Sequence, residues 1–117
     1  MSDERDRRYL TYIREAIALI EARTLAGREA FLDNVDTQDA VLWRLETLAE
    51  ATGKLSRAIK ARHPQIAWRE VYGFRNIAAH AYLDLHLDEV WEIIELHLLA
   101  LKSVVAEELS RFTQSEP

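Results

Sequence analysis

Scarcity of glycine and proline is the feature that most constrains the fold of this chain. Its 117 residues include 3 Gly and 2 Pro, too few for the many tight turns of a β-protein. Long stretches instead carry apolar residues three and four positions apart, the spacing of one helix face. We therefore predict an all-α protein, an antiparallel bundle of four to five helices with short connections. The length indicates one domain over residues 1–117, whose last few residues form a disordered tail.

The first half of the chain is predicted to form two long helices around a short one. The first helix covers residues 3–23, and residues 28–32 add one or two helical turns. Asp36 or Thr37 is the expected cap of the second long helix. That helix continues until just before Pro64, because the residue before a proline resists helical geometry.

The second half is predicted to contain two more helices. A loop at 62–67 precedes a helix over 68–82, and a turn at 84–87 leads into the longest helix, over 88–112. Apolar residues cover an unusually wide arc of this last helix. One side of the arc can face the bundle core and another a partner surface.

Charge is distributed unevenly along the chain. The net charge is −5, so no overall positive field marks a nucleic-acid binder. Between residues 54 and 75, however, one acid, Glu70, stands against six basic residues: Lys54, Arg57, Lys60, Arg62, Arg69 and Arg75. Such a run is either a solvated helix face or a local surface that binds phosphates. As RNA-binding candidates we single out Lys54, Arg57, Arg62 and Arg69.

Several chemistries lack the residues they require. The absence of cysteine excludes disulfides, zinc–cysteine sites and thiol catalysis. No HExxH motif occurs, and no two of the four histidines stand three or four positions apart, so neither a metal site nor a cofactor is predicted. The N-terminal residues do not resemble a secretion signal, and no apolar run is long enough to span a bilayer. We therefore expect a soluble, cytoplasmic protein without a membrane partner.

One segment, Gly73 to Tyr82, combines residues suited to phosphate chemistry. An imidazole, the side chain of His80, is a group that can take or give a proton in catalysis. The guanidinium of Arg75 can hold a phosphate, and Asn76 can orient His80 or contact the same phosphate. These groups fit RNA strand cleavage without a metal. The alternative is that Arg75 forms a surface ion pair and His80 caps the helix.

The geometry of this segment raises a difficulty for a site within one chain. Arg75 and His80 are five positions apart, so on an ideal helix they point about 140° away from each other. Arg75 and Tyr82, seven positions apart, share a face.

The same segment carries a family resemblance. Residues 75–82 read R-N-I-A-A-H-A-Y, which resembles the RxxxxHxY signature of HepT-like proteins of the HEPN superfamily. These are toxins paired with minimal nucleotidyltransferase antitoxins. Four further stretches resemble the family pattern in the right order, namely residues 37–41, 48–51, 63–70 and 90–91.

The resemblance implies a HEPN-like homodimer with one helix from each protomer in a shared cleft. Arg75 and His80 would then converge with their symmetry mates. It further implies a metal-independent endoribonuclease, the toxin of a type VII-like toxin–antitoxin pair that acts on RNA and not on DNA. The antitoxin would silence it by adding AMP to Tyr82. An alternative is a non-catalytic helical protein that binds nucleotides or a nucleotidyltransferase.

Three positions depart from the family pattern. Ala67 stands where many members have proline, and residues 83–86 lack a frequent glycine. Ala81 replaces a frequent acid that would favour the imidazolium form of His80. None of the three is a predicted catalytic residue.

Overall fold

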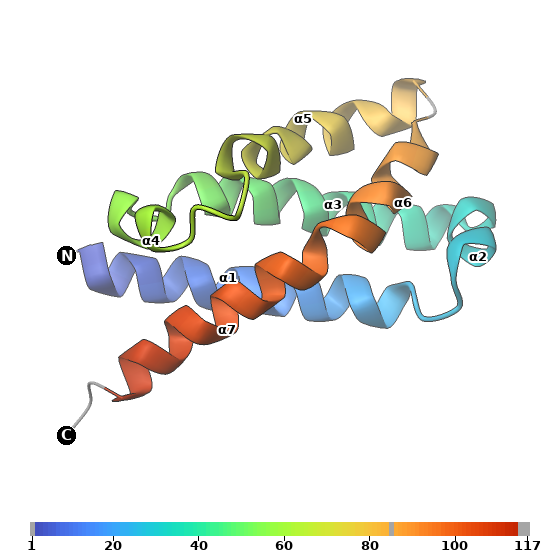
Figure 1. The fold of residues 1–117 in the computed structure, drawn as a ribbon. Helices are drawn as coiled ribbons and strands as arrows, with labels where there is room; N and C mark the ends of the chain where they lie inside the picture. Colours follow the sequence, from blue (N-terminus) through green and yellow to red (C-terminus); the bar gives the residue numbers. More distant parts are fainter. Residues whose placement is uncertain (1, 85, 115–117) are drawn as a thin grey trace.

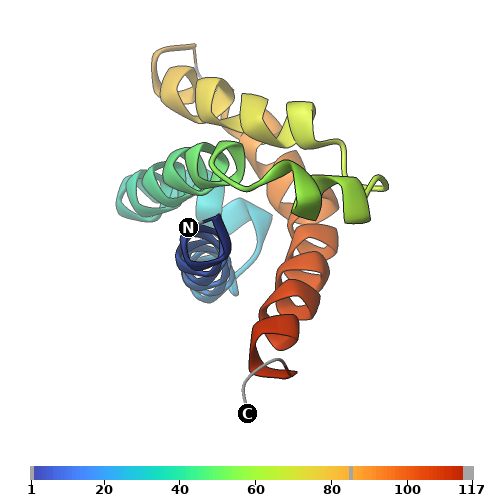
Figure 2. The same cartoon turned by 90° about the vertical axis from the view of Figure 1, so that its left-hand side faces the viewer.

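Three long helices lie side by side, with α3 (Val35–Gly53) between α1 (Ser2–Arg23) and α5 (Trp68–Asp84), and two further helices cross them (Figures 1 and 2). The computed structural model describes residues 2–84 and 86–114, and within these ranges it contains seven helices and no strand. The helices are α1 (Ser2–Arg23), α2 (Arg28–Asp33), α3 (Val35–Gly53), α4 (Arg57–Arg62), α5 (Trp68–Asp84), α6 (Leu87–Leu96) and α7 (Leu98–Gln114). The predicted all-α class is confirmed. Residue 85 of the predicted turn and residues 115–117 of the predicted tail lie outside the described ranges.

The core is built from the apolar stripes that the helical spacing indicates. On α1 the fully buried side chains recur every three or four residues, at Leu10, Ile13, Ile17 and Ile20. Helices α3 and α7 pack against α1 and help to cover these side chains. Burial of each such side chain stabilises the fold by about 1.5–3 kcal/mol.

The predicted second long helix is wrong in two respects. Its cap is Asn34, whose side chain accepts a hydrogen bond of 2.9 Å from the backbone of Thr37, and not Asp36 or Thr37 itself. The helix also ends at Gly53, and α4 begins anew after Ser56. The Ser56 side chain caps α4, and its backbone N–H donates to Asp6 of α1 at 2.9 Å. A hydrogen bond to a residue 50 positions away thus accompanies the break.

The predicted last helix is also two helices. It breaks at His97, and α6 packs on α5 while α7 packs on α1. The His97 ring contacts Phe74 of α5 edge-on, with centroids 5.2 Å apart. The break lets α6 follow α5 and α7 follow α1, which buries much of the apolar arc, whereas Leu96 and Leu99 stay 62% and 72% exposed. The two breaks and the short α2 explain why there are more helices than the four to five predicted, and they make α1 the longest helix.

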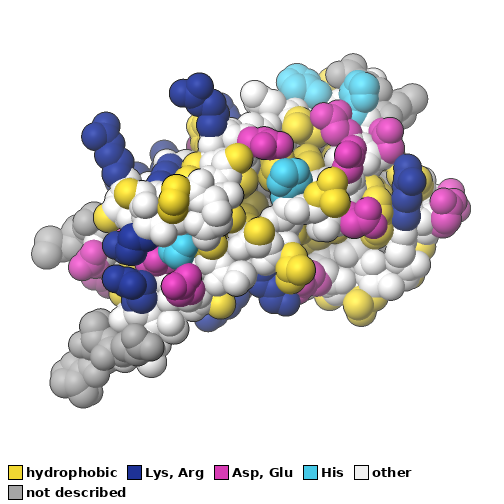
Figure 3. Space-filling model, in the orientation of Figure 1, with side chains coloured by type: hydrophobic (Ala, Val, Ile, Leu, Met, Phe, Trp, Pro, Cys, Tyr) yellow, Lys and Arg dark blue, Asp and Glu magenta, His cyan; other side chains and the backbone are white. Residues whose placement is uncertain are grey.

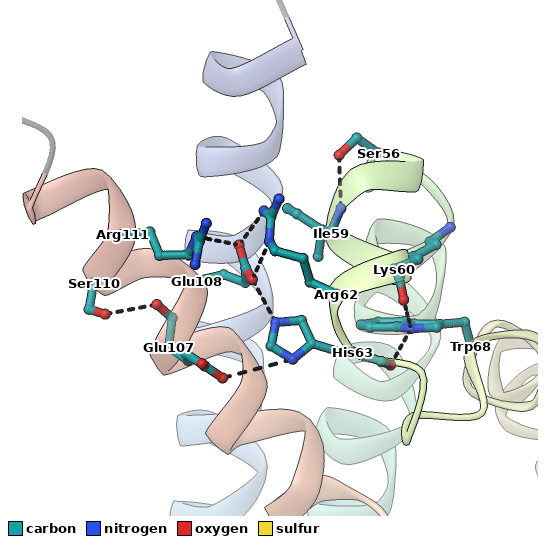
Figure 4. Close-up of polar contacts among 10 residues, drawn as sticks. All are labelled: Ser56, Ile59, Lys60, Arg62, His63, Trp68, Glu107, Glu108, Ser110 and Arg111. Atoms are coloured by element: carbon teal, nitrogen blue, oxygen red, sulfur yellow. Dashed lines mark hydrogen bonds and ion pairs between the residues drawn. The ribbon is translucent and has the colours of Figure 1, made fainter.

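A buried carboxylate ties the loop before α5 to α7 (Figure 4). The Glu108 side chain is 2% exposed and accepts two hydrogen bonds from Arg62, at 2.7 and 3.0 Å. His63 Nε2 lies 2.6 Å from the same carboxylate. The hydrogen bonds from Arg62 lower the pKa of Glu108, and burial opposes them only in part. The pKa of Arg62 is correspondingly raised.

The start of α5 rests on this cluster. The indole N–H of Trp68 donates to the carbonyls of His63, at 3.0 Å, and of Lys60, at 3.2 Å. The cluster of Glu108, Arg62 and His63 therefore fixes both the loop and the first residue of the helix that carries the sequence motif.

We predict that Glu108→Gln lowers the free energy of unfolding by about 3 kcal/mol, the lower end of the range for breaking a buried pair, because Arg62 is 39% exposed. Since folding lowers the pKa of Glu108, its stabilising effect is complete above the ordinary glutamate pKa of about 4.3. The effect is lost as the pH falls through the lower folded value. Urea unfolding followed by circular dichroism should therefore show a wild-type advantage that shrinks below about pH 4. Glu107→Gln is the matched control, because this carboxylate is next in sequence and 3.8 Å from His63 Nδ1 but is 64% exposed, so that its loss should change stability little. Equal stability of the two variants would contradict the prediction.

Candidate active site on helix α5

Helix α5 presents the motif because its other face is apolar. Its buried side chains recur at helical spacing and anchor the helix to α3 and α6: Val71, Phe74, Ala78 and Ala81. Arg75, Asn76 and His80 lie outside this stripe. The structure thus places all three predicted catalytic residues at the surface of one helix.

Arg75 faces α3. Its Nη1 donates to Glu50 Oε2 at 3.3 Å, and its guanidinium carbon lies 4.5 Å from the ring centre of Tyr72. The side chain is 39% exposed, so part of the guanidinium can reach a ligand. The surface ion pair that we considered as the alternative role of Arg75 is present. It leaves other N–H groups of the guanidinium available.

His80 faces the opposite neighbour, α6. Together with Asn76 it lines an open hollow of about 280 Å³, which Ile77, His86 and Glu89 complete. The imidazole is exposed. The structure therefore brings His80 and Asn76 to one hollow, where an imidazole and an amide can approach the same phosphate.

The divergence expected from the five-residue spacing is found. Arg75 contacts α3, whereas His80 lies beside the start of α6, so the two side chains do not meet within one chain. The backbone of Tyr82 continues α5, but its side chain lies outside the described part of the structure.

The predicted RNA-binding residues lie toward the other end of α5. Figure 3 shows Lys and Arg side chains gathered over α4 and the first turn of α5, whereas Asp, Glu and His side chains are frequent over α6. Arg57 of α4 and Arg69 of α5 are exposed, as is Lys54 at the end of α3. Arg62 instead binds Glu108, so much of its hydrogen-bonding capacity is used within the fold. Contact of these residues with RNA stays a prediction.

Sequence reasoning missed the two partners of Arg75. Glu50 stands in the stretch 48–51, which we noted only as part of a family pattern, and Tyr72 precedes the motif by three residues. The spacing of Tyr72 and Arg75 could have indicated their contact, because residues three apart are neighbours on a helix. Nothing local could have indicated Glu50, which belongs to another helix.

The described residues, 2–84 and 86–114, hold neither a metal-binding cluster nor a membrane-spanning helix. No group of three or more His, Cys, Asp or Glu side chains there is arranged to hold a metal ion. No helix within the same ranges is long and apolar enough to cross a membrane.

Fold and site together define an all-helical protein with an arginine–histidine motif on an exposed helix face. Residues 13–108 match the family described as "Ribonuclease HepT-like", and this match covers most of the chain and the whole motif. The chain belongs to the HepT-like ribonuclease family. The resemblance seen in the sequence is confirmed.

Individual relatives agree with the family match. The chain is 37% identical over 95 residues to "Probable ribonuclease HepT" of Thermococcus cleftensis, covering 80% of this chain and 86% of that protein. It is 32% identical over 98 residues to a Methanocaldococcus jannaschii protein named as a gamma-glutamylcyclotransferase and candidate RNase, covering 83% of this chain and 44% of that protein. A candidate RNase of Caldanaerobacter subterraneus is 28% identical over 106 residues, covering 90% of this chain and 95% of that protein. No solved structure matches the chain.

Proposed function

We propose that this protein is an endoribonuclease toxin that cleaves RNA without a metal ion. The observation that carries the proposal is the placement of Arg75 and His80 at the surface of one helix, within the region that matches a ribonuclease family. Relatives named as ribonucleases along most of this chain support the same activity.

The proposed reaction is an internal transesterification. The ribose 2′-oxygen loses its proton and attacks the adjacent phosphorus, while the bond from phosphorus to the 5′-oxygen of the next nucleotide breaks. The leaving 5′-oxygen takes up a proton. An imidazole such as His80 can serve either proton transfer near neutral pH. Arg75 would hold the phosphate and stabilise the charge that develops on its oxygens.

Two protomers are proposed to build one cleft. Within a chain Arg75 faces α3 and His80 faces α6, so a second copy is the simplest source of a complementary residue. Two histidines in a shared cleft would also supply both a proton acceptor and a proton donor. Lys54, Arg57 and Arg69 would guide the RNA backbone toward that cleft.

Regulation is proposed to come from a minimal nucleotidyltransferase in the same cytoplasm. Addition of AMP to Tyr82 would place a phosphodiester and a base on the helix of Arg75 and His80. The phosphate would compete with RNA for the guanidinium. A type VII-like toxin–antitoxin pair would operate in this way.

We predict that His80→Ala and Arg75→Ala each reduce RNA cleavage by about 10²–10⁴-fold, because each removes a group that acts on the transferring phosphate or its protons. Cleavage by the wild-type protein should persist in excess EDTA. Gel assays on a labelled RNA, with circular dichroism to verify folding, measure both effects. Arg28→Ala, which removes an exposed arginine of α2 that belongs neither to the motif nor to the hollow, is the control. Full activity of either motif variant, or no cleavage by the wild type, would leave the non-catalytic alternative.

We predict that the functional unit is a homodimer. Light scattering at micromolar concentration should give twice the chain mass. A strict monomer that still cleaves RNA would refute the shared cleft, because Arg75 and His80 do not meet within one chain.

We predict that co-expression with the partner nucleotidyltransferase adds AMP to the peptide containing Tyr82. Mass spectrometry should detect at least one AMP increment on that peptide, and the modified protein should no longer cleave RNA. Tyr82→Phe should cleave RNA yet escape silencing, whereas Tyr9→Phe should be silenced like the wild type. A co-expressed protein that is silent but unmodified would show that the antitoxin acts by binding.

A further inference from the structure

Arg75 is held from two sides by residues outside the sequence motif. Glu50 of α3 accepts one hydrogen bond from Nη1 at 3.3 Å, and Tyr72, one turn earlier on α5, lies against the guanidinium at 4.5 Å. The Nε of Arg75 is buried and has no hydrogen-bond partner among the described residues. The inner part of the guanidinium is therefore enclosed, while the side chain as a whole remains 39% exposed.

The position of the Tyr72 ring depends on Gly53. A Cβ atom at Gly53 would overlap the Cε1 and Cδ1 atoms of this ring. Only a residue without a side chain lets α3 approach the ring so closely. The last residue of α3 thus makes room for the ring on which Arg75 rests.

The contact with Glu50 matters more for geometry than for stability. Both partners are substantially exposed, at 39% and 48%, and pairs this exposed add little to the free energy of unfolding. A flat guanidinium with one edge tied to a carboxylate and one face on a ring has few remaining orientations, however. Glu50 accepts a hydrogen bond from one N–H, so the guanidinium retains donors for a second oxyanion.

We propose that Glu50 and Tyr72 are positioning residues, which orient the Arg75 guanidinium so that its free N–H groups meet the scissile phosphate. This inference rests on the proposed function, because it assigns these residues a part in RNA cleavage. Neither residue touches the reacting atoms. They fix the orientation of the Arg75 guanidinium before RNA binds, so that the catalytic step does not have to include the entropy cost of orienting it.

The opposite role of Glu50 makes a distinct prediction. A carboxylate that merely competes with RNA for Arg75 would lower affinity, and its removal would lower KM and leave kcat unchanged or higher. A positioning carboxylate raises kcat, so that its removal lowers kcat even though the site gains positive charge. The direction of the change in kcat therefore separates the two roles.

Steady-state cleavage of a labelled RNA tests the proposal. We expect Glu50→Ala to lower kcat by about 10-fold to 100-fold without raising KM in proportion. Glu46→Ala is the matched control, because it removes a carboxylate one turn earlier on the same helix, where no contact with Arg75 is found among the described residues. Tyr72→Leu should lower kcat by a similar factor. Tyr72→Phe, which keeps a ring beneath the guanidinium, should restore it to within about threefold of the wild type.

Nuclear magnetic resonance of the arginine side chains gives a readout that does not depend on cleavage. In the ¹⁵N-labelled protein, the Nε–H signal of Arg75 is assigned by its loss in Arg75→Lys. Because this nitrogen is buried, its proton should exchange slowly with water. Glu50→Ala and Tyr72→Leu should each speed that exchange, whereas Glu46→Ala should not.

The two measurements separate the failure of this inference from that of the proposed function. A wild-type protein that cuts no RNA but has a slowly exchanging Arg75 proton would refute the function and, with it, the catalytic part of the inference. An active wild type with unchanged kcat in Glu50→Ala and Tyr72→Leu would refute the inference alone. A higher kcat in Glu50→Ala would assign Glu50 as a competitor of RNA.

Discussion

The buried carboxylate of Glu108 is the contact on which the placement of α5 depends. A carboxylate with 2% exposure is costly unless its charge is paired, and here Arg62 and His63 supply the pairing. Both partners stand at the end of α4, directly before the loop that leads to α5. Pairing within the cluster therefore positions the loop. Trp68, the first residue of α5, is positioned in turn by the hydrogen bond from its indole to the carbonyl of His63.

Helix α5 packs against α3 and α6, and the side chains of its motif are divided between the sides that face these two helices. Its side toward α3 holds Arg75 between Glu50 and Tyr72, in a setting that favours a fixed guanidinium. Its side toward α6 leaves His80 in an open hollow, where an imidazole keeps access to water and substrate. The groups proposed to bind phosphate and to transfer protons are thus separated within one chain. A shared cleft between two copies would unite them, which is why the proposed function and the proposed dimer stand together.

Much of the fold could be predicted from the sequence, because helix formation depends on local spacing. The bounds of α1, α2 and α5 agree with the predicted ones to within one or two residues, and the buried stripe of α1 follows the apolar period. The breaks after Gly53 and at His97 could not be predicted in this way. The apolar period continues through both, and the contacts that accompany the breaks, Asp6 with Ser56 and Phe74 with His97, join residues far apart in sequence.

The sequence by itself determined that the chain is helical, that it belongs with the HepT-like ribonucleases, and that Arg75, Asn76 and His80 share one helix. Only the tertiary structure decided which of the charged side chains are paired. Arg62, one of the basic residues of the charge run, forms an ion pair with Glu108, and Arg75 forms one with Glu50. These partners are 46 and 25 positions away along the chain. The physical reason is that the apolar period depends only on residues close together on one helix. An ion pair between helices depends on which side chains the packing of those helices brings together.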